Sequence, residues 1–421
     1  MKYIRKRYGN YLINEFKGQK IIINVETGFV FICSEMMYDF LVSDQEISFS
    51  EYIKKCNGHY PEILIDAFAK KVELYKEYLF SENKMDFKLE KYDYIKTLSL
   101  YITSSCNMQC KYCFIEQDIK SENTSMTIDT AKYISECYFD YLKGRKGNII
   151  FTGGEPLINF PIIQYIVDTA RKRKLDIDFM IKTNGTLLSD EIQEFIIFNK
   201  IEVQISLDGN QEAHDKNRIF PNGEGTFKVV ASKITDFINR GYGDFLKLHG
   251  TVTSETIHYV RKSVDYIRNQ FSNIVFDLKP VRDKYSGLSD EEYLYFEEVL
   301  KKIDYKETKG ICGIGKWHLA IDPVGNIFPC YSLIGIEKYK IGNIFLNGLN
   351  VKKIERLEQI YSRWEKEECK DCYLNRVCCN GCYADKLLQE DGCNNADAML
   401  FRRLTTNMSE DIDNIALMPI I

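Results

Sequence analysis

The chain has 421 residues, of which 45% are hydrophobic and 28% are charged, and its formal net charge at pH 7 is −5. This length suggests about two to four domains, each large enough to bury its own core. The negative charge argues against nucleic-acid binding, which requires a basic surface. No apolar run of about 18 residues is present, so we expect no membrane span. The first residues contain no apolar stretch typical of a signal peptide, which predicts a cytoplasmic protein.

Residues 1–84 predict a small separate domain, in which short strands come first and helices follow. The expected strands are Tyr11–Phe16, Gln19–Asn24 and Gly28–Cys33. The expected helices are Ser34–Leu41, Ser48–Lys55 and Pro61–Tyr78. The polar, charged stretch Ser81–Lys96 then predicts a linker.

From Thr97 onward, strands and helices alternate, which predicts an α/β fold with βαβ units and a parallel sheet. The expected strands are Leu98–Thr103, Asn148–Thr152, Asp178–Lys182, Glu202–Leu207, Leu246–Thr251 and Ile274–Leu278. The expected helices are Thr127–Leu142, Pro161–Arg173, Ser189–Asn199, Phe227–Arg240 and Glu255–Phe271. Six such repeats fit a partial (β/α)6 barrel, whose functional residues are expected at the strand ends.

Cys106, Cys110 and Cys113 form a Cys-x3-Cys-x2-Cys motif directly after the first of these strands. Three thiolates so close in sequence can bind three corners of a small inorganic cluster. A structural zinc site normally has four protein ligands, and a [4Fe–4S] cluster also takes four ligands. The motif therefore predicts an iron that is open to a substrate or cofactor.

This motif resembles that of the radical S-adenosylmethionine (radical SAM) superfamily, and the resemblance extends from roughly Tyr11 to Arg403. It implies that residues 97–300 form a radical SAM core, in which the three cysteines hold a [4Fe–4S] cluster. SAM would chelate the open iron and be split into methionine and a 5′-deoxyadenosyl radical. The cofactors then supply the chemistry, while the protein supplies position, electrostatics and dryness.

Further motifs follow the next strands, at Gly153–Pro156, Thr183–Leu188 and Ser206–Arg218. Glycines allow close approach of the backbone, and a carboxylate can meet an ammonium group. The SAM contacts that the resemblance implies are Tyr112, Gly153, Gly154, Glu155, Ser206 and Arg218, with Tyr112 on the adenine and Gly153–Glu155 on the methionine amino group. An ordinary turn, an N-cap serine and a surface ion pair are the alternative interpretations of these motifs. His214 is expected to be structural.

A second group of cysteines resembles the SPASM extension of radical SAM peptide maturases, over residues 306–403, with a tail at 404–421. The resemblance implies two auxiliary [4Fe–4S] clusters, which makes three in all. The outer cluster would be held by Cys369, Cys372, Cys378 and Cys393, and the inner one by Cys312, Cys330 and Cys382. Because Ile303–Ile311 lacks a further cysteine, the inner cluster is expected to keep an open iron, unless Cys379 fills it. A zinc ribbon is the alternative.

These parts predict a maturase that forms thioether links in a ribosomally made, Cys-rich precursor peptide. The N-terminal domain resembles a winged-helix recognition element, which implies that the leader of the precursor adds as a strand to the sheet edge. A structural cap is the alternative interpretation of that domain. A flavodoxin- or ferredoxin-type protein is the expected electron donor.

Three other functions remain open at this point. The first is an anaerobic sulfatase-maturing enzyme that makes formylglycine, although the 105 residues ahead of Cys106 argue against it. The second is carbon–carbon crosslinking or epimerisation of a peptide. The third is a zinc-stapled, non-enzymatic peptide-binding module. Asp277 and Glu116 are acids near strand ends, but the sequence assigns no general base.

Overall fold

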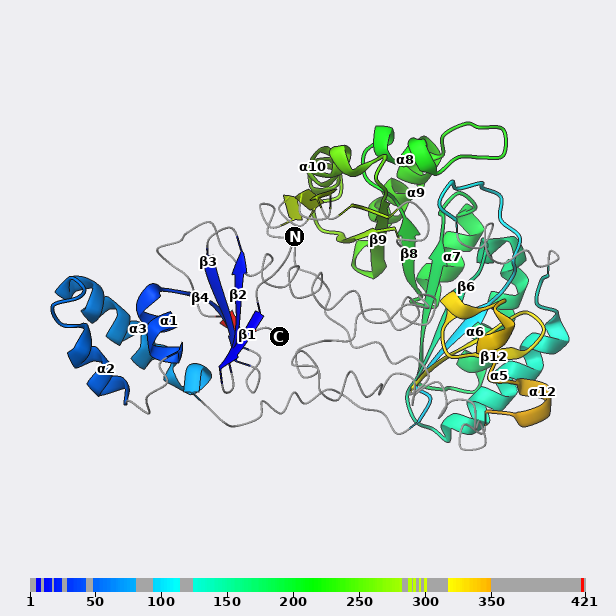
Figure 1. The fold of residues 1–421 in the computed structure, drawn as a ribbon. Coiled ribbons are helices and arrows are strands. Elements are labelled where there is room, and N and C mark those ends of the chain that lie inside the picture. Colours follow the sequence, from blue (N-terminus) through cyan, green and yellow to red (C-terminus); the bar gives the residue numbers. More distant parts are fainter. Residues whose placement is uncertain are drawn as a thin grey trace. The chain divides into compact units, whose positions relative to one another are not determined.

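A computed structural model of the chain describes residues 5–8, 11–16, 19–24, 29–42, 48–80, 94–113, 124–281, 287–289, 291–292, 295–296, 299–300, 317–349 and 418–419 (Figure 1). The chain forms two compact units. One contains the N-terminal strands and helices, and the other contains a large, mainly parallel sheet. Among the described residues, no helix is long and apolar enough to span a membrane.

The N-terminal unit is built on an antiparallel sheet with the strand order β1-β2-β3-β4-β14. Its strands are β1 (Arg5–Tyr8), β2 (Tyr11–Phe16), β3 (Gln19–Asn24), β4 (Phe29–Cys33) and β14 (Met418–Pro419). The three strands expected from the sequence are confirmed. The sequence analysis missed β1, because its residues, RKRY, carry charge in place of the apolar alternation that marks a strand.

Three helices follow the sheet, and they pack on it through one small core. They are α1 (Glu35–Val42), α2 (Phe49–Cys56) and α3 (Glu62–Phe80). Ser48 begins α2 with a capping box, in which its side chain accepts from the Glu51 N–H and Glu51 accepts from the Ser48 N–H. The core combines Ile13 and Ile22 of the sheet with helix residues such as Met37. Cys56 is buried here.

The second unit contains a nine-stranded sheet with the order β10-β9-β8-β7-β6-β5-β11-β12-β13. Six neighbouring strands run parallel in chain order, and β11 adds to β5 in parallel. The six are β5 (Thr97–Tyr101), β6 (Gly147–Thr152), β7 (Ile177–Thr183), β8 (Glu202–Ser206), β9 (Leu246–Val252) and β10 (Val275–Pro280). The expected strands and the α/β class with a parallel sheet are therefore confirmed. Strand ends differ from expectation by one or two residues.

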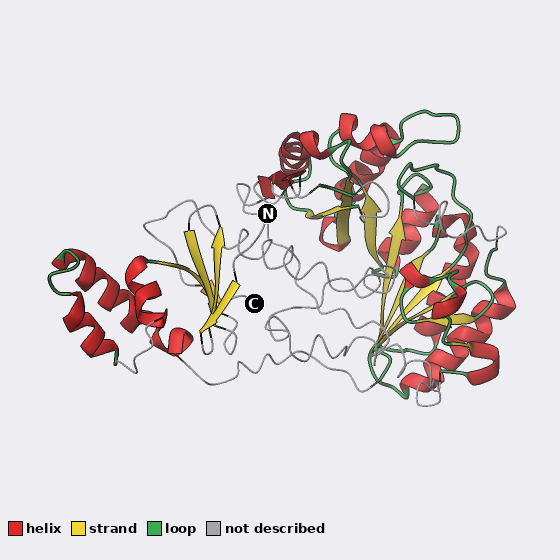
Figure 2. Cartoon of the chain, in the orientation of Figure 1, coloured by secondary structure: helices red, strands yellow, loops and turns green. Residues whose placement is uncertain are grey.

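Helices cover one face of this sheet (Figure 2). They are α5 (Ile128–Leu142), α6 (Phe160–Lys172), α7 (Asp190–Phe198), α8 (Gln211–Asn217), α9 (Phe227–Asn239) and α10 (Val260–Gln270). In β8 the residues Val203 and Ile205 are buried in the core shared with these helices, whereas Gln204 and Ser206 are only half-buried on the other face. This alternation gives the sheet an apolar outer face and a more polar inner face.

Strands β11 (His318–Ile321), β12 (Asn326–Phe328) and β13 (Gly342–Asn343) extend the sheet beyond β5. The register places Ala320 of β11 beside Ser99 of β5. The Ser99 hydroxyl and His318 Nε2 lie 2.8 Å apart, which fixes β11 against the parallel sheet. Burial lowers the pKa of His318 to about 4, so its ring is neutral at pH 7. The segment that carries Cys330 is thereby held next to β5.

Candidate active site

The cysteine loop leaves the carboxyl end of β5 and is held by the backbone after α8. The Gln109 N–H donates to the Ile219 carbonyl at 2.8 Å, and the Lys111 N–H donates to the Asn217 carbonyl at 3.0 Å. Within the loop, the Cys113 N–H donates to the Cys110 carbonyl at 3.1 Å. The loop that carries all three thiols is therefore fixed by residues more than a hundred positions later.

The three thiols carry no disulfide. Cys106 is exposed and the other two are partly buried. Protein atoms around the thiols limit their hydration and raise the pKa of Cys106 to about 11 and that of Cys110 to about 12. Metal binding would therefore displace thiol protons. Among the described residues, no three His, Cys, Asp or Glu side chains converge as ligands of a single ion. Thiolates of a [4Fe–4S] cluster bind separate irons, so three thiols on one loop suit a cluster.

Gly153 and Gly154 follow β6 and contact the backbone of residues 103–105, which form the stem of the cysteine loop. The Gly154 N–H donates to the Thr103 carbonyl at 2.8 Å. A Cβ at Gly153, whose φ is +144°, would lie 2.4 Å from the Thr103 oxygen, and one at Gly154 would lie 2.3 Å from the Ser105 oxygen. Glycine is thus required here for contact between two backbone segments. Contact of both glycines with the methionine amino group stays a prediction.

Glu155 is fully buried and joins the second loop to the third. Its Oε1 accepts from the Thr183 hydroxyl at 2.7 Å and from the Leu157 N–H at 3.1 Å. Its Oε2 accepts from the Asn184 N–H at 2.7 Å. Burial raises the pKa of Glu155 to about 7, although these hydrogen bonds oppose the shift. Its contact with an ammonium group likewise stays a prediction.

Asn184, which begins the turn after β7, connects this carboxylate to the cysteine loop. Its Nδ2 donates to Asn107 Oδ1 at 2.9 Å and lies 3.8 Å from the Cys106 sulfur. Asn107 in turn donates from its Nδ2 to the Thr186 hydroxyl at 2.8 Å. The sequence analysis did not assign Asn107 a role, although an asparagine directly after a ligand cysteine was the available signal.

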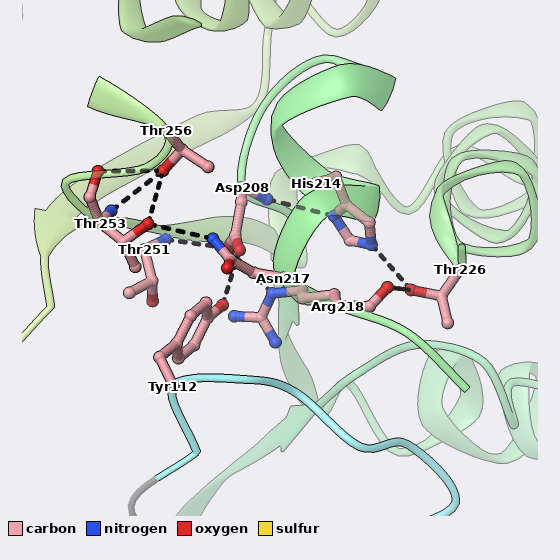
Figure 3. Close-up of polar contacts among 9 residues, drawn as sticks. All are labelled: Tyr112, Asp208, His214, Asn217, Arg218, Thr226, Thr251, Thr253 and Thr256. Carbon is pink, nitrogen blue, oxygen red and sulfur yellow. Dashed lines mark hydrogen bonds and ion pairs between the residues drawn. The ribbon is translucent and has the colours of Figure 1, made fainter. Parts of the chain in front are cut away.

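Tyr112, Asp208 and Arg218 form a polar cluster in which Asp208 and Arg218 are buried and Tyr112 is half-buried (Figure 3). The Arg218 Nε donates to Asp208 Oδ1 at 2.9 Å, and the Tyr112 hydroxyl donates to Asp208 Oδ2 at 2.6 Å. Asp208 Oδ1 also accepts from the Thr251 N–H at 2.8 Å. The guanidinium lies 5.3 Å from the centre of the Tyr112 ring. The structure therefore brings together two predicted SAM contacts, through an aspartate that the sequence analysis did not single out.

His214 supports this cluster from α8 (Figure 3). The Asp208 N–H donates to its Nδ1 at 3.3 Å, and its Nε2 lies 2.9 Å from the Thr226 hydroxyl. That hydroxyl donates to the Arg218 carbonyl at 2.9 Å, so the hydrogen bonds assign the ring proton to Nε2. Burial lowers the pKa of His214 to about 3. A neutral, fully bonded ring has the structural role that the sequence predicts.

The remaining predicted residues divide into those that the structure describes and those that it does not. Ser206 is half-buried on the inner face of β8. Cys330 is buried at the start of the 3-10 helix η5 (Tyr331–Leu333), and its sulfur lies 3.4 Å from the Ser332 nitrogen. Asp277 lies in β10, 3.2 Å from His249 Nδ1. The residues outside the described part are Glu116, Cys312, Cys369, Cys372, Cys378, Cys379, Cys382 and Cys393.

Comparison with known families identifies this arrangement. Residues 100–267, which contain the cysteine loop and the loops after β6, β7 and β8, match the radical SAM superfamily. The chain therefore carries a radical SAM domain, the class of enzyme domain that binds SAM beside an iron–sulfur cluster.

Relatives that match about seven-tenths of the chain or more include a sulfatase-maturating enzyme and a radical SAM synthase. It is 26% identical to a cysteine-type anaerobic sulfatase-maturating enzyme of Clostridium novyi, over 69% of this chain and 89% of the relative. It is 24% identical to the radical SAM cyclopropyl synthase TigE of Paramaledivibacter caminithermalis, over 76% of this chain and 71% of TigE.

Two solved structures share the fold. Native anSMEcpe with bound AdoMet has a TM-score of 0.62 and 23% identity, over 74% of this chain and 95% of that one. Streptococcus suis SuiB bound to its precursor peptide SuiA has a TM-score of 0.52 and 15% identity, over 92% of this chain and 98% of SuiB.

Replacement of Gly154 by alanine is expected to destabilise the site, because the new Cβ meets backbone oxygens that cannot yield as a flexible side chain would. We expect a cost of about 2 kcal/mol and a lower iron content after reconstitution. Thermal melting and iron analysis measure both effects. Gly243→Ala is the control, since its Cβ would meet only the end of the Ile274 side chain, at 3.3 Å. Equal stability of the two variants would contradict this explanation.

The raised pKa of Glu155 predicts a pH-dependent stability in the metal-free protein. Since its folded-state pKa of about 7 exceeds the ordinary value of 4.5, the folded state binds the proton more tightly and stability falls as pH rises through 7. From about pH 6 to about pH 8 this group should cost about 1 kcal/mol, or roughly 2–4 °C in melting temperature. Glu155→Gln should lose that part of the dependence. An identical pH profile in both proteins would refute the assignment.

Proposed function

We propose that this protein is a radical SAM maturase that forms thioether links in a ribosomally made, Cys-rich precursor peptide. The assignment of radical SAM chemistry is supported above all by the convergence of four loops around the cysteine motif. Backbone hydrogen bonds tie the cysteine loop to Gly154, Glu155 and the segment after α8, and Asn184 reaches the Cys106 sulfur. The cluster and SAM, when bound there, supply a 5′-deoxyadenosyl radical for hydrogen abstraction.

The residues proposed for SAM are placed to hold its charged and aromatic parts. Arg218 uses its Nε for Asp208, so its terminal nitrogens can bind a carboxylate. Tyr112 uses its hydroxyl for the same aspartate, which fixes the ring and makes its face suitable for adenine. Ser206 lies on the inner face of β8 with a hydroxyl suited to a ribose. Glu155, Gly153 and Gly154 would lie near the methionine amino group.

The N-terminal unit is proposed to recognise the leader of the precursor. It combines an antiparallel sheet with three helices, as a winged-helix-like element does, and all of these elements except β14 lie within residues 1–84. An extended peptide can add to the outer strand of such a sheet through main-chain hydrogen bonds. The fold shared with SuiB covers 92% of this chain, and SuiB has been solved with a bound precursor peptide. This supports a peptide substrate for the present chain.

The auxiliary clusters are proposed to decide what the radical is used for. Residues 306–403 would form the SPASM domain, with Cys312, Cys330 and Cys382 on an inner cluster that keeps one open iron. A substrate cysteine bound there would be deprotonated and held beside an electron acceptor. The cluster would supply a site for the substrate thiolate and an acceptor for the one electron that is released when a substrate carbon radical and that sulfur form a bond. Cys330 is buried in the segment next to β5, which supports an inner cluster close to the radical SAM core.

Formylglycine formation is the second candidate, because the sulfatase-maturating relative is covered over 89% of its length. The fold shared with anSMEcpe covers 74% of this chain, whereas the fold shared with SuiB covers 92%. The longer match favours a precursor peptide. A flavodoxin- or ferredoxin-type donor and a reducing cytoplasm complete the proposal, since three iron–sulfur clusters need both.

The proposed reaction predicts a defined product from a Cys-rich peptide encoded beside this gene. After anaerobic reaction with SAM and a reductant, mass spectrometry should show the loss of two hydrogen atoms per link. The linked cysteines should resist alkylation, because a thioether has no free thiol. The same peptide without SAM is the control. A formylglycine product, or an unchanged mass with complete SAM cleavage, would refute thioether formation.

The two cysteine groups are expected to differ in function. Cys106→Ala should reduce SAM cleavage to background, because it removes a ligand of the radical-generating cluster. Cys330→Ala should leave SAM cleavage measurable while crosslinking is lost, because it removes a ligand of the inner cluster. The measurements are 5′-deoxyadenosine by chromatography and crosslinked peptide by mass spectrometry. Cys56→Ala, in the N-terminal core, is the control for loss of a buried thiol. If Cys106→Ala and Cys330→Ala changed SAM cleavage and crosslinking to the same extent, the two cysteine groups would not have the separate functions proposed here.

A further inference from the structure

Tyr101 is the last residue of β5 and precedes the cysteine loop. Its side chain is 2% exposed. Its neighbours Leu100 and Ile102 belong to the core that the helices cover. Because side chains alternate along a strand, Tyr101 lies on the opposite, inner face, where it packs with Ala320, Phe328 and Ile334. Tyr101 therefore lies on the inner face at the carboxyl edge from which the cysteine loop leaves.

The Tyr101 hydroxyl is buried and has no hydrogen-bond partner among the described residues. Other buried tyrosines in the same unit are satisfied. The Tyr138 hydroxyl donates to the Lys96 carbonyl at 2.5 Å, and the Tyr242 hydroxyl donates to the Ile201 carbonyl at 2.8 Å. A buried hydroxyl without a partner incurs its full desolvation penalty, so such groups are rare and call for an explanation. A partner that is not part of the described protein would supply one.

The surroundings of the phenol indicate what that partner is. Burial raises the pKa of Tyr101 far above its usual range, and the neighbouring thiols of Cys113 and Cys106 add to this rise. A phenol carries its proton at neutral pH and therefore acts as a hydrogen-bond donor. Cys106, a predicted cluster ligand, follows Tyr101 by five positions on the loop that leaves this edge of the sheet. A cluster held by that loop would bring sulfur acceptors to the edge at which the phenol lies.

We propose that the Tyr101 hydroxyl donates a hydrogen bond to a sulfur atom of the iron–sulfur cluster held by Cys106, Cys110 and Cys113. This rests on the cluster assigned to these cysteines and is independent of the thioether product. A hydrogen bond to a cluster sulfur stabilises the more negative, reduced form and raises the reduction potential. Tyr101 is thus a positioning residue that makes the cluster easier to reduce before SAM is cleaved.

The test compares Tyr101→Phe, which removes one oxygen atom, with Tyr138→Phe, which removes a buried hydroxyl bonded elsewhere. Both proteins are reconstituted anaerobically, and the midpoint potential of the cluster is measured by redox titration followed by EPR. The signal of this cluster is the one that addition of SAM perturbs. In Tyr101→Phe the midpoint should become more negative, and the ratio of reduced to oxidised cluster at the wild-type midpoint should fall about two- to tenfold. Tyr138→Phe should leave the potential unchanged.

The metal-free protein supplies a second readout. Tyr101→Phe should melt at the wild-type temperature or above it, because the hydroxyl that it removes has no partner among the described residues. Tyr138→Phe should melt lower, because it loses its bond to Lys96. A fluorinated tyrosine at position 101, which is a stronger donor of similar shape, should shift the potential in the opposite direction to phenylalanine.

Two results would overturn the proposal. They are an unchanged potential in Tyr101→Phe and an equal shift in Tyr138→Phe. If the unchanged potential of Tyr101→Phe were accompanied by weaker SAM binding, the hydroxyl would be assigned to SAM. Failure of the proposed function is distinguishable from these. A shifted potential with no thioether product would refute only the product, whereas a wild-type protein without iron and sulfide would refute the radical SAM site itself.

Discussion

The site depends on one buried carboxylate. Glu155 accepts three hydrogen bonds from two different segments, and its own N–H donates to the stem of the cysteine loop. It therefore fixes the loops after β5, β6 and β7 relative to one another. Burial raises the pKa of this group to about 7, which shows the electrostatic cost of the arrangement. The three hydrogen bonds offset much of that cost by bonding both carboxylate oxygens.

The other side of the site follows a different principle, in which opposite charges are buried together. Asp208 accepts hydrogen bonds from Arg218, Tyr112 and the Thr251 backbone. His214 holds the Asp208–Arg218 ion pair in place by accepting a hydrogen bond from the Asp208 N–H. A buried ion pair is tolerated when its remaining polar atoms are also bonded, and Asp208 meets this condition. The guanidinium is consequently fixed in direction. In the proposed function, this rigid cation would bind the carboxylate of SAM and the buried carboxylate would lie near its ammonium group.

Much of the fold and part of the site could be predicted from the sequence. The six parallel strands were predictable because short apolar runs alternate with helical segments along the chain. Each observed strand end lies within two residues of the predicted one. Strand β1 was not, because its charged residues carry no apolar signal and it is defined by pairing with β2. The roles of Asp208 and Asn184 could not be predicted either, since their partners Tyr112 and Cys106 lie about a hundred and about eighty positions away. The glycines after β6 were assigned to ligand contact, and the structure shows that they first serve contact with Thr103 and Ser105.

The sequence by itself predicted the class of cofactor site that this protein carries, and the radical SAM match of residues 100–267 agrees with it. Three thiols in a fixed local spacing predict a cluster with an open iron, because ligand type and spacing are local properties of the chain. Only the tertiary structure decided which polar side chains form hydrogen bonds within the protein and which have no partner among the described residues. Glu155 faces backbone donors, Arg218 faces Asp208, and the Tyr101 hydroxyl faces no described partner. Those roles depend on segments that parallel strands bring to one edge of a sheet, and a hydrogen bond between distant segments leaves no local pattern in the sequence.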